Sequence, residues 1–134
     1  MKPELKYLSP ILWTKDLQET IEFYTDTLGF SAQSNFPNFV SLSRGHVEIM
    51  FVVPQDDSEA GEVDEPFFPR PLLTGSLYIN VKHVDQLWEE FEDKAEVLSP
   101  LCDREYWMRD FSIRDNNGYE LVFGESIPYN EQVP

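Results

Sequence analysis

The sequence predicts an α+β fold in which two βαβββ modules, related by a pseudo-twofold axis, form one domain of 134 residues. Two observations carry this prediction. The order strand, helix, glycine turn recurs in both halves. The apolar positions of the two predicted helices also match pairwise at a constant offset of 67 residues, Leu17, Ile21 and Tyr24 with Val84, Trp88 and Phe91. We therefore interpret the chain as an internal duplication.

The first module is expected over residues 5–54. An apolar run favours a strand at 8–14, and Asp16 followed by Glu19 is typical of a helix N-terminus. The helix carries apolar residues as far as Leu28, and Gly29 stands where a helix commonly ends. Three strands complete the module, with Arg44 and Gly45 marking the last turn; they are predicted at 30–34, 38–43 and 47–53.

The second module is expected over residues 76–126, with a strand at 76–81 and a helix from Val84. Strands at 108–114 and 119–123 form its last hairpin around the turn 115–118. Gly118 lies 73 residues after Gly45, six more than the helix offset, so we expect an enlarged loop at 98–106 that is free to bind. Between the modules, 55–75 is predicted to be an acidic linker or lid, whose apolar end at 67–73 packs on the domain or on a second subunit.

Charge and cysteine content limit the partners. Ten basic and 25 acidic residues give a net charge of -15, which disfavours nucleic acid and membrane surfaces as partners. The same field attracts cations, although acidity also serves solubility. No apolar run approaches the roughly 20 residues of a membrane span. The single cysteine, Cys102, excludes an intrachain disulfide and favours the cytoplasm; with no histidine near it in sequence, we expect an unreactive thiol.

Strand alternation predicts two faces for each sheet. The side chains expected against the helices are Leu12, Val47, Ile49, Phe51, Leu77, Ile79, Val81, Tyr119, Leu121 and Phe123. The opposite faces carry Ser9, Ile11, Trp13, His46, Glu48, Met50, Ser76, Tyr78, Asn80, Glu120 and Val122. This mixture of aromatic, amide and carboxylate groups is typical of a small-molecule pocket, which we expect in a cleft between the modules.

Several short motifs occur in a fixed order from about Leu8 to Glu125. They are Phe23-Tyr24, Leu28-Gly29-Phe30 and the stretch Arg-Asp-Asn-Asn-Gly-Tyr-Glu-Leu at 114–121. Together they resemble the vicinal-oxygen-chelate superfamily, which includes glyoxalase I, extradiol dioxygenases, fosfomycin-resistance transferases and bleomycin-resistance proteins. Residues 76–79 and 106–111 resemble the bleomycin-resistance-like branch. That resemblance implies a glyoxalase/bleomycin-resistance-like fold and a homodimer with ligand sites in its clefts.

The resemblance also implies where a metal would bind. Metal-dependent members place histidines or carboxylates on equivalent strands, because a divalent ion needs three or four converging ligands. Here Ser9, Ser76 and Val122 occupy those positions, and only Glu48 matches a ligand. We therefore expect no metal and no cofactor. A shifted metal site that uses Glu48, Glu120 and His46 stays open, while His46 and His83 are otherwise expected to be structural.

The expected ligand-binding residues are Trp13, Glu48, Met50, Tyr78, Asn80, Trp107 and Glu120; catalytic residues are unknown. Glu48 and Glu120 either pair across the cleft, as acid and base or as a cation trap, or are solvated. The rings of Trp13, Tyr78 and Trp107 either stack on a planar or cationic ligand or pack in the core. Trp88 is expected in the core. For Arg109 and Asp110, either a structural salt bridge is expected, or one of the two charged side chains reaches a pocket or the dimer contact.

These expectations lead to three functional hypotheses. The first is a metal-independent protein that binds and sequesters a cationic or aromatic compound, as in bleomycin-resistance-like proteins and antibiotic resistance. The alternative is a metal-dependent glyoxalase-like lyase or dioxygenase with a non-standard site. The third is an interaction module whose cleft is vestigial.

Overall fold

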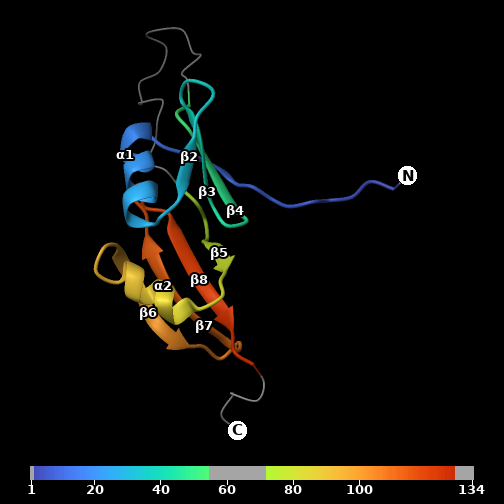
Figure 1. Ribbon diagram of the computed structural model, residues 1–134, viewed down its shortest axis with the longest axis vertical. Helices are drawn as coiled ribbons and strands as arrows, with labels where there is room; N and C mark the ends of the chain where they lie inside the picture. Colours follow the sequence, from blue (N-terminus) through green and yellow to red (C-terminus); the bar gives the residue numbers. More distant parts are fainter. Residues whose placement is uncertain (1, 55–71, 129–134) are drawn as a thin grey trace. The chain divides into compact units, whose positions relative to one another are not determined.

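The computed structural model describes residues 2–54 and 72–128, and the chain divides into two compact units after Arg70. Each unit contains a four-stranded sheet and a helix (Figure 1). Most of the predicted acidic linker, with the greater part of its apolar end, falls at 55–71 and lies outside the described residues. The union of the two modules in one domain stays a prediction.

In the first unit, the strand order across the sheet is β1 (Ile11–Trp13), β4 (Val47–Val52), β3 (Phe39–Arg44) and β2 (Ser31–Gln33). β1 runs parallel to β4, whereas β2, β3 and β4 pair in antiparallel fashion. The helix α1 (Leu17–Glu22) lies between β1 and β2 in the chain. This is the predicted βαβββ order, with strand ends shifted by at most three residues.

The first helix begins as predicted but does not continue as one α-helix. The Asp16 side chain caps it by accepting the backbone N–H of Glu19 at 3.0 Å. After Glu22 the chain widens into a π-helical turn, η1 (Phe23–Thr27), in which the N–H of Leu28 bonds to the carbonyl of Phe23. The expected single helix through Leu28 is therefore wrong in its second half. Apolar spacing does not separate the two helix types, because both bury Tyr24 and Leu28 on the sheet side.

The second unit repeats this topology with the strand order β5 (Leu77–Asn80), β8 (Glu120–Ser126), β7 (Met108–Arg114) and β6 (Glu96–Asp103). β5 is parallel to β8, and the other neighbours are antiparallel. The helix α2 (Val84–Phe91) joins β5 to the remaining strands. The two βαβββ modules of the α+β prediction are confirmed.

The enlarged loop predicted at 98–106 is wrong, because most of this segment is strand. β6 has eight residues where its counterpart β2 has three, and only the turn from Arg104 to Trp107 leaves the sheet. The pairing of β6 with β7 shifts register between Val97 and Ser99 and again between Ser99 and Cys102. Such irregularities absorb extra residues within an edge strand, so an insertion need not become a loop.

The core of each unit lies between its helix and one face of its sheet. Six of the ten residues predicted to face the helices are buried: Leu12, Ile49, Phe51, Tyr119, Leu121 and Phe123. The other four, Val47, Leu77, Ile79 and Val81, are half-buried. Trp88 is also half-buried and packs on Phe111, with ring centroids 5.1 Å apart. Within the described residues, no helix combines the length and apolarity that crossing a membrane requires.

Candidate functional site

A carboxylate is held between two serines on the face of the first sheet that points away from α1. The hydroxyl of Ser9 donates to Oε1 of Glu48 at 2.7 Å, and the hydroxyl of Ser41 donates to Oε2 at 2.6 Å. The parallel pairing that sets Ile11 beside Met50 also brings Ser9 alongside Glu48. The bond from Ser41, followed by the bond from Ser9, lowers the pKa of Glu48 below its ordinary value. Glu48 is therefore an oriented anion at neutral pH.

Apolar side chains continue this face away from the carboxylate. Ile11 and Trp13 follow Ser9 at alternate positions of β1 and are 56% and 43% exposed. Met50 pairs with Ile11 and is half-buried. Ser9 and Trp13 are four residues apart, about 13 Å along an extended strand. The face thus changes from anionic to aromatic over a distance that suits one small ligand.

The second sheet has a different polar centre, built on Asp110 of β7. Asp110 is only 2% exposed. Its Oδ2 accepts the hydroxyls of Tyr78 at 2.9 Å and Tyr106 at 2.7 Å, and its Oδ1 accepts Nε of Arg104 at 2.7 Å. Burial opposes ionisation of Asp110, but the bonds from Tyr106, Arg104 and Tyr78 outweigh it and lower the pKa of this carboxyl. Burial, followed by the bond to Asp110, raises the pKa of Tyr78 far above its ordinary range.

A glycine allows Tyr78 to reach Asp110 across an intervening strand. Asn80, Gly124 and Asp110 occupy one row of neighbouring positions on β5, β8 and β7. A β-carbon at Gly124 would lie 2.7 Å from Cζ of Tyr78, well inside van der Waals contact. The phenol of Tyr78 therefore crosses β8 over the bare backbone of Gly124. An isolated glycine in a strand is a known sign of close approach, and it is the signal that sequence reasoning overlooked here.

The structure distributes the seven predicted ligand residues over both units. Trp13, Glu48 and Met50 share the open face of the first sheet. Tyr78 and the exposed Asn80 lie on β5 of the second sheet, and Glu120 begins β8. Trp107 lies in the turn before β7, 54% exposed and with a φ of 64°, a strained conformation for a large side chain.

Glu120 does not reproduce the arrangement around Glu48. Within the described parts of the chain, no side chain donates a hydrogen bond to Glu120, and Ser76, the counterpart of Ser9, is exposed. The hydroxyl of Ser112, the counterpart of Ser41 in the repeat, is buried without a hydrogen-bond partner among these residues. The duplication keeps these residue types but not their contacts.

The donor set does not fit the metal that the fold family implies. The Ser9 hydroxyl is already donated to Glu48, and Val122 has no donor atom. Over residues 2–54 and 72–128, no group of three or more His, Cys, Asp or Glu side chains comes together. His46 is exposed in the turn before β4, and His83 precedes α2 with a left-handed backbone.

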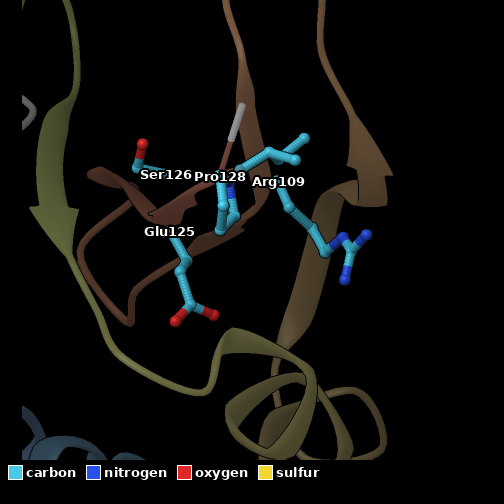
Figure 2. A pocket seen from close by; sticks show the side chains of 5 residues that line it. Arg109, Glu125, Ser126 and Pro128 are labelled. Atoms are coloured by element: carbon cyan, nitrogen blue, oxygen red, sulfur yellow. The ribbon is translucent and has the colours of Figure 1, made fainter. Parts of the chain in front are cut away.

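A pocket of 220 Å³ lies at the end of β8, lined by Arg109 of β7, by Glu125 and Ser126 of β8, and by the two residues that follow, Ile127 and Pro128 (Figure 2). Two charged side chains line it, and both have structural partners. Glu125 accepts the backbone N–H groups of His83 and Val84, each at 3.0 Å, and Arg109 donates Nε to Asp103 at 2.6 Å. Figure 2 shows their charged ends directed away from each other. Arg109 and Asp110 each form a salt bridge, but not with each other: Arg109 pairs with Asp103, and Asp110 pairs with Arg104. Arg109 also lines this pocket, which is not our candidate site because structural partners hold both of its charged side chains.

Comparison with known proteins agrees with the fold. Residues 6–123 match the family model of the Glyoxalase/Bleomycin resistance protein/Dioxygenase superfamily. No curated protein matches the chain. A glyoxalase/bleomycin resistance protein/dioxygenase from Nocardioides is similar in structure, with 18% identity, coverage of 100% of this chain and 91% of that one, and a TM-score of 0.72. TioX from Micromonospora sp. ML1 is similar with 17% identity, coverage of 91% and 99%, and a TM-score of 0.70. At such identities these structures show the fold alone.

Proposed function

We propose that this chain, which belongs to the Glyoxalase/Bleomycin resistance protein/Dioxygenase superfamily, binds and sequesters a small cationic aromatic molecule without using a metal ion. One observation carries the proposal. Glu48, at the single expected ligand position that has kept a carboxylate, is held by Ser9 and Ser41. Both hydroxyl protons point at the carboxylate, so its orientation is fixed before any ligand binds. Within the described residues, no cationic side chain pairs with this carboxylate.

The surroundings of Glu48 favour an organic cation over a bare ion. Ile11 and Trp13 expose apolar surface on the same face, and an indole ring attracts a cation that has shed part of its water. A ligand with a positive centre next to a planar ring would contact both ends of this face. The net charge of -15 adds attraction from a distance.

The test compares two probes of the same shape by isothermal titration. N-methylquinolinium carries a permanent charge, whereas quinoline is neutral at neutral pH. We expect the cation to bind more tightly, and we expect Glu48→Gln to weaken its binding by about tenfold, which corresponds to 1.4 kcal/mol. Glu120→Gln is the matched control, because it removes the same charge from the equivalent strand, where no serine holds it.

Two results would contradict the proposal. One is the absence of any binding tighter than millimolar by N-methylquinolinium and by a panel of cationic glycopeptide and aromatic antibiotics. The other is an equal loss of affinity in Glu48→Gln and Glu120→Gln, which would mean that the loss comes from the change in overall charge.

The lyase or dioxygenase alternative is tested by a separate measurement. Stoichiometric zinc, nickel, iron or manganese in protein purified without chelators, lost in Glu48→Ala, would replace our proposal with a metal-dependent enzyme.

A further inference from the structure

We propose that Asp110 is a positioning residue that fixes the rings of Tyr78 and Tyr106 as one binding surface for a planar, uncharged aromatic group. This inference goes beyond the proposed function, because it concerns a second aromatic-binding surface, which lies on the sheet of the second unit. Asp110 itself is buried and does not touch the ligand. It acts through the two phenols that it holds.

The geometry supports this role because both hydroxyls converge on a single atom. Tyr78 comes from β5 and Tyr106 from the turn between β6 and β7, yet each donates to Oδ2 of Asp110. A shared acceptor restricts how far either ring can move relative to the other. Despite this restraint the side chains are not packed away, since Tyr78 is 41% exposed and Tyr106 is 58% exposed. The molecule therefore holds two aromatic side chains in place and still presents them to solvent.

A purely structural role would not require this arrangement. Arg104 already neutralises the buried carboxylate and ties it to β6 through the Ser99 hydroxyl at 2.8 Å. If the cluster only stabilised the hairpin, the phenol rings would be expected to bury their apolar area along with their hydroxyls. Instead, β8 has a glycine at position 124. This residue has no side chain to pack, and its absence leaves room for Tyr78 to lie across the strand.

The electrostatics of the cluster select the ligand chemistry. Asp110 is paired with Arg104, and the high pKa of Tyr78 keeps its phenol protonated. The exposed rings therefore lie over a neutralised ion pair and present no net charge. Stacking on such a surface depends on ring area and orientation. This chemistry suits an uncharged planar ring, in contrast to the cation expected at Glu48.

The experiment is isothermal titration of the full chain with quinoline. Tyr78→Phe/Tyr106→Phe keeps both rings but removes both hydroxyls, and Asp110→Asn removes the charge that holds them. We expect each variant to bind quinoline roughly three- to tenfold more weakly. In the variants the rings are free to move, so ordering them on binding costs free energy, whereas in the wild-type protein the cluster already holds them in place. Ile113→Val, a core change on the same strand, is the control that lowers stability and leaves quinoline affinity unchanged.

Each other outcome overturns the inference. If wild-type protein fails to bind quinoline, or if both cluster variants bind it as tightly as wild type does, Asp110 does not position a binding surface. If Ile113→Val loses as much affinity as the cluster variants, the cluster is merely structural. All three results leave the effect of Glu48→Gln on N-methylquinolinium untouched, so failure here is distinguishable from failure of the proposed function. The double phenylalanine variant keeps the test valid if Asp110→Asn does not fold.

Discussion

Replacing Gly124 with alanine tests the structure of the second module directly. The added methyl group would lie 2.7 Å from Cζ and 3.0 Å from Cε1 of Tyr78. The backbone of β8 fixes the position of the methyl group. The phenol of Tyr78 must therefore move, and its hydrogen bond to Asp110 is lost. The backbone at Gly124 does not have a positive φ, so alanine adopts it without strain. The perturbation is therefore confined to the contact with Tyr78.

The expected magnitude combines two opposing effects. Loss of a hydrogen bond to an ionised carboxylate costs about 1.5 to 3 kcal/mol, and the lower end applies because Tyr78 is partly exposed. Alanine in place of glycine returns about 0.5 to 1 kcal/mol, since it restricts the unfolded chain. Gly124→Ala should therefore lower the free energy of unfolding by about 1 kcal/mol. In a Tyr78→Ala background only the second effect remains, and the same substitution should stabilise the protein by about 0.5 kcal/mol.

The assay is urea denaturation of wild type, both single variants and the double variant, which completes a double-mutant cycle. The informative quantity is the sign of the Gly124→Ala effect in the two backgrounds. An equal destabilisation with and without the Tyr78 ring would refute the reasoning, because it would locate the cost in the β8 backbone. An unchanged stability in both backgrounds would refute it as well, since Tyr78 would then not lie over Gly124.

Three further expectations follow from single features. Ser112→Ala should leave the free energy of unfolding in urea unchanged or raise it by up to about 1 kcal/mol, because it removes a buried hydroxyl that has no partner among the described residues. Glu125→Gln should cost about 1 kcal/mol by weakening the cap of α2. The bonds from Val84 and His83 lower the pKa of Glu125, so this difference from wild type should be present at neutral pH and shrink as the pH falls through the folded-state pKa. We also propose the homodimer that the resemblance implies; sedimentation equilibrium should give twice the 15.7 kDa chain mass, and a monomer at all concentrations would exclude it.

Features that depend on local pattern were predictable from the sequence. The capping carboxylate of Asp16 acts on a neighbouring N–H, and the turn at 115–118 needs a glycine at position 118 with a φ of 93°. Strand alternation also assigned Ser9 and Glu48 to one face, which made their contact possible to anticipate. Each of these predictions uses spacing along one segment, and spacing is visible in a single sequence.

Features that depend on register between strands were not predictable. Asp110 meets Tyr78 only because three strands align Asn80, Gly124 and Asp110 in one row. The sequence pattern marks Asp110 as a residue of a salt bridge, a pocket or a dimer contact, and it does not single out Tyr106 or Arg104 for a site. The bond from Ser41 to Glu48 was not predictable for the same reason, since β3 reaches Glu48 through a diagonal contact.

The duplicated modules carry different side chains at corresponding positions of their two sheets. The row that is apolar in the first sheet is polar in the second; the matching positions are Trp13, Val52 and Phe39 against Asn80, Gly124 and Asp110. Conversely, the row that holds the Glu48 anion between serines has no such clamp around Glu120. One module therefore holds an oriented, half-buried carboxylate on the same face as an exposed aromatic residue, and the other buries its carboxylate beneath exposed phenols. A duplication that kept one role in both halves would have kept the same rows. Their divergence indicates that the two modules do not repeat one arrangement of charged and aromatic groups.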